Sequence, residues 1–375
     1  MIDFKAYISS ARRIVVKLGS NVLAGQKDLN TDVINSVARQ ISSLMNHGKE
    51  VILISSGAVA AGMKKVGSVS RPTEIPEKQA MAAIGQARLI MEYDAAFSSY
   101  GVIVSQLLLT QADLRNRKRY FNARNTLNVI LSKGVVPVIN ENDTVSVEEI
   151  AFGDNDNLSA MIALLMEADL LINLTDIDGL YTNDPRIHPD AEHIKEVRVI
   201  DDSIESIAGD IPGRLGTGGM KSKINAARKV MKAGIPMIIS NGKSESVLDD
   251  IFDFNARGTF FVPSSKKIKS KKLWIAFNAA PKGSIIVDNG AREAVLEHGK
   301  SILPIGVTDV EKEFSMGDPV RVVDLDGNHI ASGLVNYSSI DIRKISCRQS
   351  FEIKHILGYK PYDEIIHRDN LVILN

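Results

Sequence analysis

The sequence lacks the features that stabilise secreted proteins or insert a chain into a membrane. Its single cysteine, Cys347, excludes internal disulfides and thiolate metal sites. The first residues contain no apolar stretch typical of a signal peptide. The longest apolar run is interrupted by Glu167 and Asp169 before it reaches the length of a membrane span. We therefore expect a cytoplasmic protein that does not enter the membrane.

An excess of charge of either sign is also missing. Lys and Arg number 45, Asp and Glu number 45, and charged residues make up 24% of the chain. This balance argues against a disordered chain and against a tail that binds polyanions. One basic run, at Arg115, Arg117, Lys118, Arg119 and Arg124, interleaves with aromatic residues. Because its surroundings are not basic, a solvated helix face or an oligomer contact explains this run better than nucleic acid does.

Several common catalytic signatures are absent. The GKS triplets at 242–244 and 299–301 have Met237 and Ala294 where the leading glycine of a Walker A motif belongs, and no GxGxxG occurs. Ser56 has no histidine nearby in the sequence, so a Ser-His-Asp hydrolase is not indicated. Any phosphate chemistry must therefore proceed without a P-loop.

What is present indicates two domains. Strand and helix signals alternate from Ile14 to Val262, which predicts an α/β domain over 1–262 with a doubly wound, mainly parallel sheet sandwiched by helices. A lysine-rich stretch at 263–273 is typical of a linker. Residues 274–375 contain short, alternating, glycine-punctuated segments, so we expect a small, mostly β second domain there.

Two clusters of carboxylates and amides flank one loop in the middle of the chain. The apolar run 135–139 predicts a buried strand, which Asn140 to Asp143 follow directly, and residues 154–157 open the next helix. Helix capping by Asn155 or Asp156, before a helix over 157–168, would account for only one or two of these eight side chains. In open α/β sheets ligands bind at the carboxyl ends of the strands, so the clusters favour a binding site.

Lysines and glycines mark three further places where an anion would fit. Lys17 interrupts a buried strand, which is costly unless an anion meets it, although snorkelling at the strand end is an equal alternative. Residues 55–57 form a strand-turn-helix junction that offers backbone N–H groups. Four glycines within 213–219 precede Lys221 and Lys223 in the first turn of a helix, where cations need an anion nearby. A flexible loop would explain these glycines alone, but not the lysines.

These residues suit phosphoryl transfer to a carboxylate. A carboxylate has a pKa of about 4, so it is ionised at neutral pH and needs no general base. The protein must instead hold two anions together with cations and N–H donors, for which Lys17, Lys223, a magnesium ion and two helix N-termini are candidates. An aspartate between the lysines, with Asp156 as the candidate, would keep them oriented and protonated.

Six motifs in this order and spacing resemble the amino acid kinase superfamily, and within it the members that phosphorylate glutamate: KLGS, SSGAVAAG, VPVINEND, GDNDNLSA, LTDIDGLYTNDPR and GTGGMKSK. The tail, with VDNGAREAVLEHGKSILPIGV, FSMGDPV and IASGLVNYSS, is similar to the PUA domain that many bacterial members carry. The resemblance implies ATP- and Mg²⁺-dependent phosphorylation of the γ-carboxylate of L-glutamate, the first step of proline biosynthesis. It also implies inhibition by proline and a homo-oligomer, a dimer or tetramer.

The resemblance also implies roles for individual residues. The implied catalytic residues are Lys17, Lys223 and Asp156. The implied glutamate-binding residues are Ser56, Gly57, Asp143 and Asn155, with the carboxylate of Asp143 suited to an ammonium group. The implied ATP-binding residues are Lys17, Thr175, Asp176, Thr217, Gly218, Gly219, Met220, Lys221, Ser222 and Lys223. No metal ligand is expected, because ATP would carry the magnesium, and we expect Lys221 to face water.

Two alternative functions remain open. Another superfamily member could act on aspartate, N-acetylglutamate or carbamate, although Asp143 argues against an acceptor without an ammonium group. The tail alone would suit an RNA-binding protein, and Arg343 and Lys344 are the residues that could touch RNA. The nearly neutral tail gives that reading little electrostatic support.

Overall fold

The computed structural model describes residues 4–23, 29–68, 72–145, 155–185, 187–207, 219–263, 275 and 280–373. These residues form two units, one with an eight-stranded sheet and one with a five-stranded sheet. Apart from Pro263, the predicted linker over 263–273 lies outside the described residues, so it stays a prediction. None of the described helices combines the length and apolar composition needed to cross a membrane.

The first unit is built on a mainly parallel sheet. Its strands are β1 (Arg13–Leu18), β2 (Glu50–Ile54), β3 (Val104–Leu109), β4 (Val136–Glu141), β5 (Leu170–Thr175), β8 (Glu196–Val197), β9 (Met237–Asn241) and β10 (Gly258–Phe261). They run in the order β3-β4-β2-β1-β5-β9-β10-β8, and only the β9 and β10 pair is antiparallel. The order reverses beside β1, because β2 lies on one side of it and β5 on the other. Such a switch point opens a crevice at the carboxyl ends of the strands.

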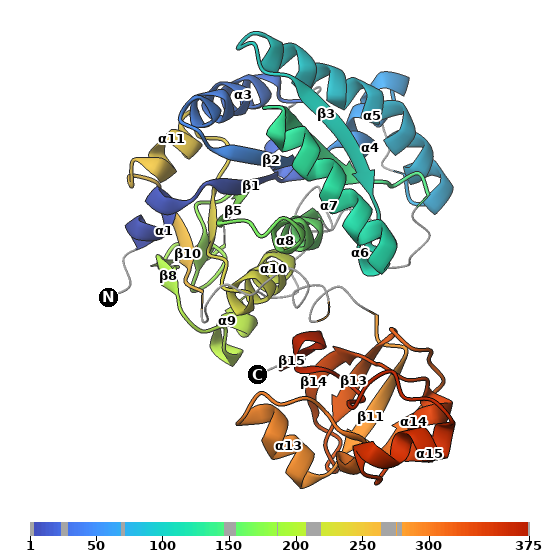
Figure 1. Cartoon of the computed structure of the whole chain (residues 1–375). Coiled ribbons are helices and arrows are strands. Elements are labelled where there is room, and N and C mark those ends of the chain that lie inside the picture. The colour runs from blue at the N-terminus through green and yellow to red at the C-terminus, as the bar shows by residue number, and fades with distance from the viewer. Residues whose placement is uncertain are drawn as a thin grey trace. The chain divides into compact units, whose positions relative to one another are not determined.

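Helices cover both faces of this sheet (Figure 1). They are α1 (Phe4–Ser10), α2 (Ser20–Leu23), α3 (Thr31–Asn46), α4 (Ala58–Val66), α5 (Ile75–Ser98), α6 (Gln111–Arg115), α7 (Arg117–Ser132), α8 (Asn155–Leu165), α9 (Asp202–Ile207), α10 (Met220–Lys232) and α11 (Val247–Phe252). Alternate residues of β1, Ile14 and Val16, join a core that includes α3 and α11. Because side chains alternate along a strand, Val15 and Lys17 face the other layer, where α8 and α10 pack together. The predicted α/β sandwich is confirmed.

The helix after the central loop begins earlier than the capping argument predicts. Helix α8 starts at Asn155, so Asn155 and Asp156 lie inside its first turn rather than at its N-cap. Their side chains contact residues of other elements, as described below, instead of capping their own helix. Both are buried, with exposed fractions of 3% and 1%.

The second unit has its own sheet and its own core. Its strands are β11 (Gly283–Val287), β12 (Val307–Glu311), β13 (Pro319–Val323), β14 (His329–Leu334) and β15 (Leu371–Ile373), in the order β12-β11-β13-β14-β15. Its helices are α13 (Asn289–Leu296), α14 (Ser339–Ile345) and α15 (Ile353–Leu357). Ile285, Val322 and Tyr337 belong to a core cluster that is separate from that of the first unit. The expected mostly β second domain is confirmed.

Candidate active site

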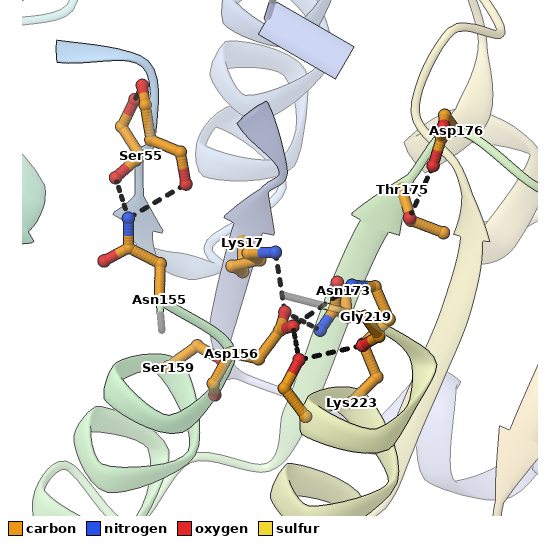
Figure 2. Close-up of polar contacts among 12 residues, drawn as sticks. Lys17, Ser55, Asn155, Asp156, Ser159, Asn173, Thr175, Asp176, Gly219 and Lys223 are labelled. Atoms are coloured by element: carbon orange, nitrogen blue, oxygen red, sulfur yellow. Dashed lines mark hydrogen bonds and ion pairs between the residues drawn. The ribbon is translucent and has the colours of Figure 1, made fainter. Parts of the chain in front are cut away.

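The carboxylate of Asp156 is the centre of a buried polar cluster (Figure 2). Its Oδ1 lies 2.6 Å from Lys17 Nζ and accepts a hydrogen bond from Asn173 Nδ2 at 2.8 Å. Its Oδ2 accepts from Ser222 Oγ at 2.5 Å and from Lys223 Nζ at 3.1 Å. Each oxygen therefore accepts from two donors, which uses the lone pairs that a carboxylate offers.

Four elements bring these groups together. Lys17 on β1 and Asn173 on β5 are partners in the parallel register, so both side chains leave the sheet on the same face. Asp156 lies in the first turn of α8, and Lys223 lies in the first turn of α10. Helix packing thus closes a charge cluster over the middle of the sheet, at the strand-order switch.

The neighbouring lysines keep the Asp156 carboxylate ionised although it is buried. Lys17, Asp156 and Lys223 expose only 4%, 1% and 5% of their surface. Burial alone would raise the pKa of Asp156, but the charges of Lys17 and Lys223 and the attached hydrogen bonds hold that pKa far below its usual range. The arrangement thus fixes two ammonium groups beside one carboxylate, with a net positive charge for an anion to meet.

A second set of polar groups lies at the ends of β2 and β4. Asn155 Nδ2 donates to Ser56 Oγ at 2.9 Å, to the Ser55 carbonyl at 3.0 Å and to Asn140 Oδ1 at 3.1 Å. Gly57 follows in a left-handed conformation, with φ of 97°, and leads into α4. The structure thus brings three of the predicted glutamate-binding residues, Ser56, Gly57 and Asn155, into one neighbourhood.

Asp143, the fourth predicted glutamate-binding residue, has an unusual environment. It follows β4, and its Oδ1 is buried without a hydrogen-bond partner among the described residues. Burial raises its pKa to about 6. An unpaired carboxylate that is largely withdrawn from water is suited to a cationic ligand.

The predicted ATP-binding residues are divided between β5 and α10. Thr175 ends β5 and donates from Oγ1 to Asp176 Oδ1 at 3.2 Å. Asp176 also accepts from Asn21 Nδ2 at 3.1 Å. Gly219 precedes α10 and has no side chain to cap it, and the N-terminus of a helix favours a negatively charged ligand.

The remaining predicted residues of that loop differ in their surroundings. Ser222 donates to Asp156, Met220 is half-buried, and Lys221 is exposed. Thr217 and Gly218 lie outside the described residues. No group of three or more His, Cys, Asp or Glu side chains in the described part of the chain could hold a metal ion.

Sequence reasoning missed two polar contacts of this region. Asn173 lies in an otherwise apolar strand, LLINLT. A single amide among aliphatic residues is the sequence feature that could have marked it as part of the site. Gln86 lies on α5 and accepts a hydrogen bond from Asn140 Nδ2 at 2.8 Å. Nothing in the local pattern of that helix distinguishes Gln86 from a surface residue.

Comparisons with known proteins agree with this geometry. The model of the Amino acid kinase family matches residues 12–241, and the model of the PUA domain matches residues 283–357. Glutamate 5-kinase of Thermoanaerobacter sp. (strain X514) is 50% identical over 363 residues, which cover 96% of this chain and 98% of that protein. Glutamate 5-kinase of Geobacter sulfurreducens is 50% identical over 368 residues, which cover 98% and 99% of the two chains.

A solved structure supports the fold. Carbamate kinase from Giardia lamblia bound to AMP-PNP superposes with a TM-score of 0.50 at 18% identity, over 68% of this chain and 99% of that one. Together with relatives that are 50% identical over almost the full length of both chains, these matches confirm the resemblance inferred from the motifs. The chain therefore belongs to the glutamate 5-kinases of the amino acid kinase family and carries a PUA domain.

Proposed function

We propose that this chain transfers the γ-phosphoryl group of ATP to the γ-carboxylate of L-glutamate. The observation that carries this proposal is the pair of lysines, from β1 and α10, that meets on the buried carboxylate of Asp156. Two anionic substrates repel each other, and fixed ammonium groups at the point of transfer offset that repulsion. The names of the relatives supply the acceptor, glutamate.

The transfer needs no proton to be removed from the acceptor. A γ-carboxylate oxygen attacks the γ-phosphorus, the bond from that phosphorus to the β,γ-bridging oxygen breaks, and the electron pair leaves with ADP. The products are an acyl phosphate and ADP. Mg²⁺, bound to the phosphates of ATP, would shield their charge. The chain's task is then to position the reactants and to stabilise the migrating negative charge.

Lys17 and Lys223 would neutralise the transferring group, while Asp156 positions them. Because Asp156 is held ionised, its carboxylate attracts both ammonium groups and fixes their positions. The positive charges of the two lysines would then stabilise the phosphoryl oxygens. With four donors on its two oxygens, Asp156 has no lone pair left for magnesium.

Glutamate would bind at the ends of β2 and β4. The Asp143 carboxylate suits the ammonium group, and Ser56, Gly57 and Asn155 offer hydroxyl, backbone and amide contacts. An acetylated amine carries no charge, so this environment favours glutamate over N-acetylglutamate.

ATP would bind across β5 and α10. Thr175 and Asp176 end the strand, and the segment from Thr217 to Lys223 leads into α10. The helix dipole at the start of α10 favours phosphate. Magnesium is assigned to ATP rather than to protein ligands.

An acyl-hydroxamate assay tests the proposal. The purified chain, ATP, Mg²⁺ and hydroxylamine are incubated with L-glutamate, L-aspartate, N-acetylglutamate or carbamate, and hydroxamate and ADP are measured. We expect ADP release to depend strongly on L-glutamate and hydroxamate to form from it. A chain that releases ADP faster with any other acceptor would refute the proposal.

Three further properties belong to the same proposal because the family implies them. We infer that proline inhibits at or near the glutamate site, that the chain forms a dimer or tetramer, and that it works in the cytoplasm. Inhibition is measured by the glutamate KM at increasing proline concentration, and assembly by sedimentation.

RNA binding by the second unit is the other candidate. The guanidinium of Arg343, one of the two residues considered for it, donates instead to the carbonyls of Val310 and Lys312 within its own unit. Lys344 is exposed. An RNA mobility-shift assay with the full chain, at physiological salt, tests this candidate.

A further inference from the structure

Helix α5 contacts the ends of both strands that carry the proposed glutamate site. Gln86 Oε1 accepts from Asn140 Nδ2, at the end of β4, at 2.8 Å. Two helical turns later, the hydroxyl of Tyr93 lies 2.9 Å from Ser55 Oγ, at the end of β2. Gln86 is half-buried and Tyr93 is fully buried.

The side-chain amides of Gln86, Asn140 and Asn155 are linked by hydrogen bonds, and we call these three residues the amide chain. The backbone N–H of Glu141 donates to Asn140 Oδ1 at 2.9 Å, and because an N–H can only donate, this fixes which end of the Asn140 amide is oxygen. That oxygen also accepts from Asn155 Nδ2 at 3.1 Å. The Ser55 carbonyl, which can only accept, holds Asn155 in the same orientation.

The amide chain leaves one acceptor oxygen, that of Asn155, without a partner in the described part of the chain. With its nitrogen side held by three acceptors, Asn155 turns its oxygen the other way. Asn155 Oδ1 is buried and has no hydrogen-bond partner among the described residues. The same holds for Asp143 Oδ1. Each is a buried acceptor oxygen without a described partner, and such an oxygen is suited to an ammonium group.

We propose that Gln86 is a positioning residue that orients Asn155, through Asn140, for recognition of the ammonium group of the acceptor. This inference rests on the proposed function. Gln86 Oε1 is the last acceptor of the amide chain, and its donor is Asn140 Nδ2. Because Asn140 is 3% exposed, water cannot easily take over that bond. Without it, Asn140 Nδ2 has lost its acceptor and only the two bonds to its oxygen hold the Asn140 amide, so that oxygen is fixed less firmly toward Asn155.

The close crossing of α4 and α5 prevents the helix from adjusting to such a loss. A Cβ added at Gly85 would lie 1.9 Å from the Ala58 carbonyl oxygen, and one at Gly62 would lie 1.8 Å from the Met81 carbonyl oxygen. The backbones therefore touch beside Gln86. A shift of α5 toward a rotated Asn140 is blocked by this contact.

The test compares two substitutions of Gln86 in the full-length chain. Gln86→Met keeps the length and removes the acceptor, whereas Gln86→Glu keeps an oxygen acceptor. We expect Gln86→Met to raise the glutamate KM by about tenfold, while kcat and the ATP KM stay within about twofold. Gln86→Glu should restore the glutamate KM to within about threefold of the starting chain. Met91→Gln, at a 69% exposed position of the same helix, is the control and should leave all three parameters unchanged.

A second readout separates positioning from general damage. Glutarate has both carboxylates of glutamate but no ammonium group, so its inhibition constant should not change in Gln86→Met. The preference for glutamate over glutarate should therefore fall by about tenfold. Thermal melting of each variant without ligand checks that the fold is retained.

The outcomes distinguish this inference from the function on which it rests. If the unsubstituted chain forms no hydroxamate from glutamate, the proposed function fails first. If that chain is active and Gln86→Met leaves the glutamate KM unchanged, or weakens glutamate, glutarate and ATP equally, the positioning role of Gln86 is refuted and the function stands.

Discussion

At the scale of single residues, Lys223 is the side chain whose loss separates catalysis from binding. It shares Asp156 with Lys17, so in Lys223→Ala the carboxylate keeps one ammonium partner and the fold should persist. The missing charge is needed most when negative charge migrates between the reactants. We expect kcat to fall by a factor of about 10²–10³ and the glutamate KM to change little, as measured by ADP release.

A second lysine of the same helix provides the control for that experiment. Lys232 lies in the last turn of α10 and is exposed. Lys232→Ala should keep the kcat of the original chain. Equal rates in Lys223→Ala and Lys232→Ala would remove Lys223 from the catalytic residues.

The buried carboxylate of Asp143 should lower the free energy of unfolding of the ligand-free chain. Burial raises its pKa to about 6, above the value of about 3.9 in an unfolded chain. The folded state therefore binds more protons between these values, and stability falls as the pH rises from about 4 to about 6. Asp143→Asn should raise the free energy of unfolding by about 1–2 kcal/mol at pH 8 and by much less at pH 4.5.

Thermal melting at the two pH values, without ligand, measures this difference. The same substitution should raise the glutamate KM, because the amide cannot pair with an ammonium group. A variant whose stability equals that of the original chain at both pH values, and which binds glutamate normally, would contradict the role assigned to Asp143.

The sequence could predict those site residues whose type is unusual for their place in a strand or helix. A lysine inside an apolar strand and a run of Asn and Asp after another strand are rare enough to reveal Lys17, Asp143 and Asp156 as site candidates. Gln86 could not be found, because its contact with Asn140 depends on the position of α5 relative to the end of β4, which the sequence does not show. Glutamine is common on helices, and the structure is needed to show that this one contacts Asn140.

At the scale of elements, the two glycines between α4 and α5 set the distance between the helices. In Gly85→Ala the new methyl group would lie 1.9 Å from the Ala58 carbonyl oxygen and 2.3 Å from the Gly62 nitrogen, so the helices must separate. Since α4 begins directly after Gly57, the glutamate side of the site should move with it. We expect a loss of about 1–3 kcal/mol of stability and a raised glutamate KM.

The matched control is a helical glycine with room around it. A Cβ at Gly290, in α13, would meet Asp288 Oδ1 at 3.5 Å, an ordinary contact. Gly290→Ala should be neutral or slightly stabilising, because alanine is the better helix former. If Gly85→Ala melts at the same temperature as Gly290→Ala, the crossing is looser than its distances indicate.

Helix positions followed from the pattern, but the start of α8 did not. Apolar residues at helical spacing from Val33 to Leu44, followed by Gly48, predict a helix, and α3 covers that stretch. Capping rules assume that Asn and Asp at a helix start bond to their own backbone. In α8 Asn155 and Asp156 bond to other strands and helices, so the local rule misplaced the boundary by two residues.

At the scale of the whole molecule, alternation of strands and helices predicted the fold class, but not the strand order. The sheet order and the antiparallel β10 depend on packing between segments far apart in the chain. The division into two units was visible in composition, because glycine-punctuated β segments replace the helical pattern. The separate core clusters give a physical reason for that division: each sheet buries its own apolar side chains.

Two separate cores predict that the first unit works without the second. Lys17, Asn155, Asp156 and Lys223 all belong to the first unit, as do their described hydrogen-bond partners. A chain that ends after Lys267 should therefore fold and keep kcat and both KM values within about threefold of the full chain, measured by ADP release and hydroxamate formation. Its circular dichroism and melting curve control for folding. A shortened chain that melts cooperatively yet makes no hydroxamate would mean that the PUA unit takes part in the reaction, and the assignment of the active site to the first unit alone would be wrong.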